Sequence, residues 1–230
     1  MMGRLLASLA RDLRVQYRAR YMLTAVVALG VWIAALRYSP EASGYVMAPA
    51  FIFLNTFLLA FSLGLRQAVC EREAGILAAI DISPLRPHEF LAARAGSLTL
   101  IAAAQNLALA LAGGKPVASF PALLLGVSVE SVILSLMAFL VMAYTRPGNV
   151  IVARLLASAL LLGPPLAPFF GLFPGGWLNL HPLQGPLLLL QGAFFRLPLP
   201  TFALAVCSGL AWCAVLLFAC RGASARLRRE

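Results

Sequence analysis

The sequence predicts an all-α polytopic membrane protein, a single transmembrane domain over residues 1–230. Hydrophobic residues make up 62% of the chain and charged residues only 11%, which is too little charge to cover the surface of a soluble domain of this length. The hydrophobic residues gather in runs close to the roughly 20 residues that a helix needs to cross a bilayer. Six runs are predicted as transmembrane helices: Tyr21–Leu36, Tyr45–Leu65, Ala95–Ala112, Phe120–Tyr144, Val150–Phe173 and Thr201–Cys220.

Prolines interrupt the fifth of these runs, at Pro164, Pro165 and Pro168. Proline has no backbone N–H and its ring clashes with the preceding helical turn. We therefore expect this helix to be kinked or broken.

The distribution of basic residues predicts that both ends of the chain face the cytoplasm. Six crossings place the termini on the same side, and short cytoplasmic segments carry most of the Arg and Lys residues of a membrane protein. With a cytoplasmic N-terminus, fifteen of the eighteen basic residues lie inside, and only Arg37, Lys115 and Arg196 lie outside. The net charge of +10 is therefore interpreted as membrane topology and not as a nucleic-acid site.

Residues 1–20 form the first segment outside the spans. The pattern predicts a basic amphipathic helix in the membrane interface, although a segment that only sets the orientation would look the same. Apolar residues recur at helical spacing, and arginines occupy other positions: Leu5, Leu6, Leu9, Leu13 and Tyr17 against Arg4, Arg11, Arg14 and Arg18.

The loop over residues 66–94 is the longest predicted cytoplasmic connection, and it holds four of the eight acidic residues. A long charged loop between spans is usually functional. Apolar spacing over Gln67–Ile82, interrupted by Gly75, predicts one helix, and Ser83 followed by Pro84 predicts the start of a second helix that enters the third span. We expect this unit to project from the bilayer and contact a partner.

Residues 174–200 form the third segment, between the fifth and sixth spans. About twelve apolar residues bounded by prolines are too few to cross a bilayer. They predict a short interfacial or re-entrant helix that caps the outer end of the bundle.

Motifs for enzymatic chemistry are absent from the sequence. The chain has no GxxxxGK[ST], GxSxG or HExxH motif, and His88 and His181 are predicted on opposite sides of the membrane. We expect no catalytic residue, no metal site and no cofactor in this chain. His181 alone is expected to be solvated or hydrogen-bonded.

Four polar residues are predicted near the middle of the membrane: Asn55, Gln105, Asn106 and Glu130. A charged side chain at this depth costs about 3 kcal/mol. Similar depth predicts one hydrogen-bonded cluster, with Glu130 protonated because no basic residue lies at its level. Two interpretations stay open: the cluster holds helices together, or Glu130 lines a pathway and meets a cationic substrate or a proton.

The stretch CEREAGILAAIDISPLRPHEFLAAR, Cys70–Arg94, resembles the first cytoplasmic loop of ABC type-2 exporter permeases. In that family an E-x-E-x-G-T-L-like stretch leads to a turn made of a small residue, Pro and Leu, and Ile76 stands here where Thr is usual. The resemblance implies a coupling helix that docks on a separate ATPase subunit. The residues it assigns to this loop are Glu71, Glu73, Gly75, Leu77, Ser83, Pro84, Leu85, Arg86 and Glu89.

Two groups within this family resemble the chain. The Pro-Leu-Arg-Pro-x-Glu-Phe turn and the outer His-Pro-Leu-Gln segment followed by leucines are similar to small prokaryotic drug-export permeases of the fluoroquinolone type. The haem-exporter B-type permease of cytochrome c maturation is the second choice, because its ending differs from the arginine-rich tail of this chain.

The resemblance implies a permease subunit of the prokaryotic plasma membrane that exports an amphipathic drug or lipid-like substrate. ATP and Mg²⁺ would bind the separate ATPase subunit, and a second copy or a similar permease would complete the pathway. A proton-driven secondary transporter that uses Glu130 is the alternative from another class, although the unequal loops show no inverted repeat. An intramembrane scaffold fits everything except the coupling-like loop.

Overall fold

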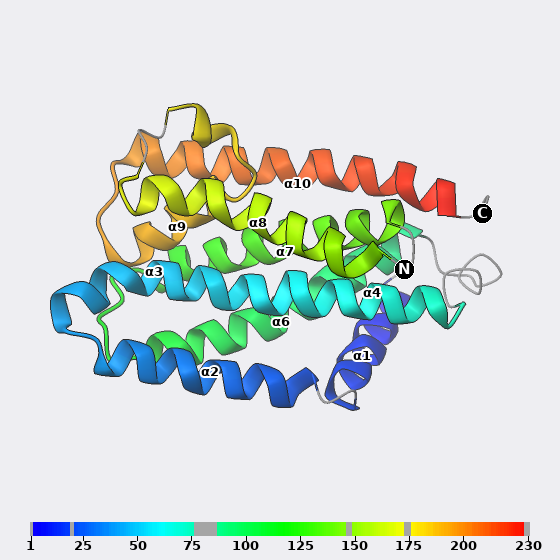
Figure 1. Ribbon diagram of the computed structural model, residues 1–230, viewed down its shortest axis with the longest axis horizontal. Coiled ribbons are helices and arrows are strands. Elements are labelled where there is room, and N and C mark those ends of the chain that lie inside the picture. The colour runs from blue at the N-terminus through cyan, green and yellow to red at the C-terminus, as the bar shows by residue number, and fades with distance from the viewer. Residues whose placement is uncertain (1, 19–20, 76–86, 146–148, 173–175, 228–230) are drawn as a thin grey trace.

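The computed structural model describes residues 2–18, 21–75, 87–145, 149–172 and 176–227, and every regular element in these ranges is a helix, as predicted. Most helices run along the long axis of the molecule, whereas α1 (Met2–Arg18) crosses them at one end (Figure 1). The end of α10 (Leu199–Leu227) lies at the same end of the molecule, and α9 (Gln184–Phe194) lies at the opposite end.

The other long helices follow the predicted apolar runs. They are α2 (Tyr21–Tyr38), α6 (Pro87–Ala112), α7 (Phe120–Tyr144), α8 (Val150–Phe169), and one continuous helix made of α3 (Glu41–Phe57), the π-helical η1 (Leu58–Leu63) and α4 (Gly64–Glu73). Among the described residues, five helices are long and apolar enough to cross a membrane, and the apolar helix Leu23–Tyr38 is shorter. The structure thus contains a helix at each of the six predicted positions.

The helices on both sides of the predicted cytoplasmic loop are longer than the apolar runs. The second helix continues to Glu73 and the third begins at Pro87. Within the predicted segment Gln67–Ile82, α4 ends at Glu73 and Gly75 has a φ of 67°, the left-handed conformation that glycine adopts after a helix terminus. Residues 76–82 of this prediction lie outside the described residues. The predicted start at Ser83 and Pro84 lies outside the described residues.

The prolines do not break α8, which is one helix up to Phe169. Pro164 cannot donate to the carbonyl of Leu160, four residues earlier. Nε2 of His181 lies 3.3 Å from that carbonyl oxygen and supplies a partner in place of the missing N–H. His181 is therefore hydrogen-bonded, as expected.

The short helix α9 lies in the predicted cap, after the 3₁₀ turn η3 (Trp177–Leu180). It packs against α3, α7 and α10, and most of its residues are buried. A Cβ atom added at Gly185 would lie 2.7 Å from the carbonyl oxygen of Ala205 in α10, so the close approach of these two helices requires glycine. This burial among the long helices is typical of a re-entrant helix.

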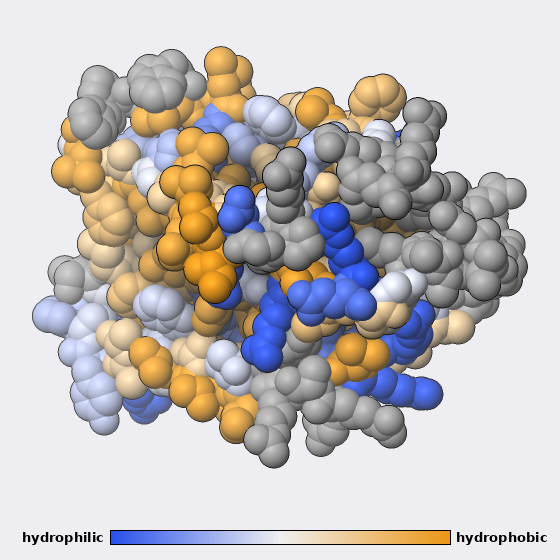
Figure 2. Space-filling model, turned by 45° about the vertical axis from the view of Figure 1, so that its right-hand side comes forward, coloured by the Kyte–Doolittle hydropathy of each residue, from blue (hydrophilic) through white to orange (hydrophobic). Residues whose placement is uncertain are grey.

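The core and the outer faces differ in composition. The helix α7 lies at the centre and contacts α3, α4, α6, α9 and α10, whereas α8 and α10 expose apolar side chains such as Leu155, Leu156 and Phe218. Figure 2, in which the α1 end is turned forward, shows hydrophilic side chains gathered at that end beside apolar surface. The exposed apolar faces fit a lipid-facing surface.

Candidate functional site

A cluster of polar side chains joins α3, α6 and α7 inside the bundle, and we call Asn55, Thr56, Asn106 and Glu130 the mid-bundle cluster. Nδ2 of Asn55 donates to Oδ1 of Asn106 at 3.0 Å, and Nδ2 of Asn106 donates to Oγ1 of Thr56 at 2.8 Å. All four residues are fully buried, at 0% exposure. The structure thus brings Asn55 and Asn106 together and adds Thr56, which the sequence analysis did not single out.

Glu130 of α7 lies beside Thr56 of α3. Thr56 donates its hydroxyl proton to the carbonyl of Ile52 at 2.9 Å, and Asn106 donates to the carbonyl of Ala102 as well as to Thr56. These groups therefore have no further proton for Glu130. Neither carboxyl oxygen of Glu130 has a hydrogen-bond partner among the described residues.

Gln105 does not join this cluster. No hydrogen bond links Gln105 to Asn55, Thr56 or Asn106 among the described contacts, and its Oε1 is buried with no partner there. Consecutive residues of a helix point about 100° apart, so Gln105 and Asn106 cannot both face α3. Only Asn106 does so.

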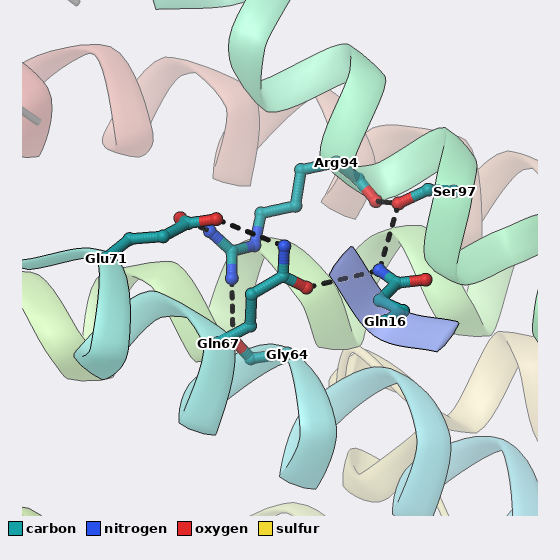
Figure 3. A network of polar contacts seen from close by, with 6 residues as sticks. All are labelled: Gln16, Gly64, Gln67, Glu71, Arg94 and Ser97. Atoms are coloured by element: carbon teal, nitrogen blue, oxygen red, sulfur yellow. Dashed lines mark hydrogen bonds and ion pairs between the residues drawn. The ribbon is translucent and has the colours of Figure 1, made fainter. Parts of the chain in front are cut away.

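A second polar cluster lies nearer the end of the bundle where α1 crosses (Figure 3). We call it the α1–α4–α6 network, and it consists of Gln16, Gly64, Gln67, Glu71, Arg94 and Ser97. The side chain of Arg94 in α6 forms an ion pair with Glu71 in α4 and donates to the carbonyl of Gly64 at 3.0 Å. Gln67 donates to the other carboxyl oxygen of Glu71 at 3.1 Å. Arg94 is 2% exposed, and it is the buried basic side chain in the part of the chain that the structure describes.

The helix α1 joins this network through Gln16. Its Nε2 donates to Oε1 of Gln67 at 3.1 Å and to Oγ of Ser97 at 3.2 Å, and Ser97 donates to the carbonyl of Arg94 at 2.9 Å. One polar side chain therefore connects the crossing helix α1 to both α4 and α6.

A second acidic side chain, Asp12 of α1, lies close to the network and is 6% exposed. Burial raises the pKa of Asp12 to about 6, and the negative charge of Glu71 adds to the effect. The positive charges of Arg94 and Arg11 act in the opposite direction. Two carboxyl groups thus lie near one buried guanidinium.

An apolar cavity of about 510 Å³ opens between α1, α6, α7 and α10. It is within the size range of small-molecule pockets, roughly 300 to 1,000 Å³. Leu9, Thr99, Val132 and Leu217 line it from the four helices. In the described part of the chain no group of three His, Cys, Asp or Glu side chains is placed to hold a metal ion.

Comparison with known proteins identifies the family. The fluoroquinolones export permease protein family matches residues 3–227 of the sequence. The chain belongs to this family. It is 28% identical to the fluoroquinolones export permease proteins of two Mycobacterium tuberculosis strains, over 200 residues that cover 86% of this chain and 84% of each relative. The resemblance to small drug-export permeases is confirmed, and the chain is a multi-pass membrane permease with bacterial relatives.

The resemblance to ABC type-2 exporter permeases assigned nine residues to the coupling loop, and the structure separates those that it describes. Glu71 and Glu89 are buried, at 8% and 2% exposure, and Glu71 is paired with Arg94. Glu73 and Gly75 are exposed at the end of α4. Leu77, Ser83, Pro84, Leu85 and Arg86 lie outside the described residues. A role in contact with a partner stays a prediction, and the ion pair makes Glu71 a residue of the helix interface.

Sequence reasoning missed most of the α1–α4–α6 network in this permease. Asp12 and Gln16 are four residues apart, so they share one face of α1, and they interrupt the apolar stripe to which Leu9 belongs. That polar interruption was the available signal. Gln67, Arg94 and Ser97 carried no comparable signal, because their partners depend on how α4 and α6 are rotated.

Proposed function

We propose that this permease is the transmembrane subunit of an ABC exporter that moves an amphipathic, drug-like substrate out of the cell. A separate ATPase subunit binds ATP and Mg²⁺ and supplies the energy. The names of the two mycobacterial relatives give fluoroquinolones as their exported compounds, and this substrate class is the first to test for this permease. The cavity lined by Leu9 and Leu217 supports an amphipathic substrate, because its walls are apolar.

The observation that carries the coupling proposal is the α1–α4–α6 network. The predicted loop lies between α4 and α6, and Arg94 joins these helices to each other through Glu71 and Gly64. Gln16 joins both of them to α1. A force applied to the loop therefore acts on three helices together, and through the continuous α3–η1–α4 helix it acts on the mid-bundle cluster.

The orientation of the chain in the membrane and its assembly with a second permease are part of the same proposal. The N-terminus and the C-terminus face the cytoplasm of a prokaryotic plasma membrane, because fifteen of the eighteen basic residues then lie inside. A second copy, or a similar permease, pairs with this chain to complete the pathway. The exposed apolar faces of α8 and α10 support such pairing within the lipid.

The test uses the tagged permease co-expressed with its neighbouring genes and purified in mild detergent. Wild type is expected to retain an ATPase subunit, and the charge reversal Glu73→Arg is expected to lose it or to uncouple ATP hydrolysis from export, because Glu73 is exposed beside the loop. Arg196→Glu is the matched control, an exposed charge reversal between α9 and α10, at the other end of the molecule. Failure of wild type to retain any ATPase, with Glu73→Arg behaving as wild type, would contradict the proposal.

A secondary transporter driven by the proton gradient is the second candidate, supported by the buried Glu130, whose carboxyl oxygens have no hydrogen-bond partner within the described ranges. The two candidates differ in their energy source. Export that stops when the proton gradient is collapsed but continues without the ATPase genes would establish this second candidate.

A further inference from the structure

Hydrogen bonds among the described residues do not satisfy every buried polar atom of the mid-bundle cluster. Both carboxyl oxygens of Glu130 and Oδ1 of Asn55 are buried with no partner among the described residues. The protons of Thr56 and of the Asn106 amide are all directed elsewhere. Buried polar atoms normally have partners, so the carboxyl group of Glu130 lacks the donor that is expected beside a buried carboxyl group.

No basic side chain of the described residues supplies that donor. Arg94 is paired with Glu71 and precedes Asn106 by twelve residues of α6, about 18 Å along the helix. Arg72 donates to the carbonyls of Met142 and Thr145 at the end of α7, again about 18 Å from Glu130 along that helix. The elements packed against α7 include α3, η1, α6, α9 and α10, and Gly209 of α10 lies against Val129, next to Glu130. Their described polar and titratable side chains at this depth carry no charge: Asn55, Thr56, Ser62, Gln105, Asn106, Gln184, Cys207, Ser208 and Cys213.

The helix geometry next to the cluster is also unusual. The π-helical η1 begins at Leu58, two residues after Thr56, and packs against α7, which carries Glu130. Single π-helical turns are rare and occur frequently at functional sites. The π-helical turn beside the fully buried cluster is therefore a second indication that this part of the bundle has a function.

We propose that Glu130 binds the positively charged group of a cationic, lipid-soluble substrate, with Oδ1 of Asn55 and the hydroxyl oxygen of Thr56 as further acceptors. This inference rests on the proposed function and names the charge of the exported compound. In the conformation described here Glu130 is neutral and carries a proton, because a lone carboxylate inside the bundle has nothing to balance its charge. When the cation binds, that proton passes to water, so the total charge in the site stays the same.

The experiment measures binding to the purified permease in detergent, without an ATPase. Ethidium is the cationic probe, because its charge does not change with pH, and Nile red is the neutral probe. Wild type is expected to bind ethidium more tightly as the pH rises, since the proton and the cation compete for one carboxylate. Glu130→Gln is expected to weaken ethidium binding about ten-fold or more, to abolish its pH dependence and to leave Nile red binding unchanged.

Gln105→Leu is the matched control, because Gln105 is a polar residue of similar burial that lies outside the cluster, and it is expected to bind both probes like wild type. Ethidium binding that is equal in wild type and Glu130→Gln would overturn the proposal. An equal loss of both probes in folded Glu130→Gln protein would also overturn it, since that result means a structural role.

A second measurement keeps the proposal testable if Glu130→Gln does not fold. Ethidium added to wild type in weakly buffered detergent solution is expected to release about one proton for each cation bound, and the absence of release would overturn the proposal. The proposed function is tested separately by ATP-dependent export. Binding that depends on Glu130 in a protein that exports nothing would contradict the exporter and leave the cation site in place.

Discussion

Glu71 and Glu130 are both buried carboxyl groups on helices of the bundle, but their surroundings differ. Glu71 has an arginine, a glutamine and the nearby Asp12 around it, in a network that connects three helices. Glu130 has the neutral side chain of Thr56 beside it and no hydrogen-bond partner among the described residues. The same residue type therefore serves two purposes: the paired carboxylate fixes the helices, and the unpaired carboxyl is available for a ligand.

The substitution Arg94→Met is expected to have the largest effect, because it removes the cation that pairs with Glu71. The substitution leaves Glu71 buried without its cation, and the removal of one partner from a buried ion pair costs about 3 to 5 kcal/mol. We expect a large fall in the thermal unfolding midpoint and in the yield of monodisperse protein in detergent. The double variant Arg94→Met, Glu71→Gln removes both charges and is expected to recover part of the loss. Equal instability of the single and double variants would show that the arginine acts through packing alone.

The pH dependence of stability tests Asp12 beside the same network. The pKa of Asp12 is raised from 3.8 to about 6 in the folded protein, so the folded state holds this proton more tightly than the unfolded state. The free energy of unfolding should therefore fall as the pH rises from about 4 through about 6, by up to about 3 kcal/mol. The measurement compares unfolding midpoints of wild type and Asp12→Asn at pH 5 and pH 7.5. An identical pH dependence in both proteins would contradict this assignment.

The same conservative substitution at the two carboxyl groups should give different results. Glu71→Gln is expected to cost about 3 kcal/mol or more, because the buried Arg94 loses its counter-charge. Glu130→Gln is expected to change the free energy of unfolding by no more than about 0.5 kcal/mol, because no charged partner is lost. Unfolding midpoints of the two variants, measured together in one detergent, check the difference. A larger loss at Glu130 would mean that the mid-bundle cluster is the structural one.

The long helices of this fold could be predicted from hydropathy, but the ends of α4 and α6 could not. Charged residues such as Glu71 and Arg94 lowered the apolar signal, so both were assigned to a loop outside the membrane. In the structure each charge is balanced by the other inside the helix bundle. A sequence shows which residues are charged, but it does not show which of them pair. Glu71 and Arg94 are 23 residues apart in the chain, and their pairing depends on how α4 and α6 are rotated about their axes.

The residues of the mid-bundle cluster could be predicted only in part, because their contacts also depend on helix rotation. Depth in the membrane selected Asn55, Asn106 and Glu130, but it could not show that Gln105 points elsewhere. Thr56 escaped notice because a threonine can satisfy its own hydroxyl with the carbonyl four residues earlier, as it does with Ile52. Its second role as an acceptor for Asn106 appears only when α3 and α6 are placed side by side.

The π-helical η1 determines the angular offset between the two halves of its helix. Asn55 and Glu71 are sixteen residues apart, and an uninterrupted α-helix would point them about 160° apart. A π-helical turn takes up about one extra residue, which reduces this offset to about 60°. Asn55 and Glu71 can therefore both bond to α6, at Asn106 and at Arg94. It follows that the number of residues between Leu58 and Leu63, rather than their identity, lets one helix reach both buried polar clusters on the same neighbouring helix.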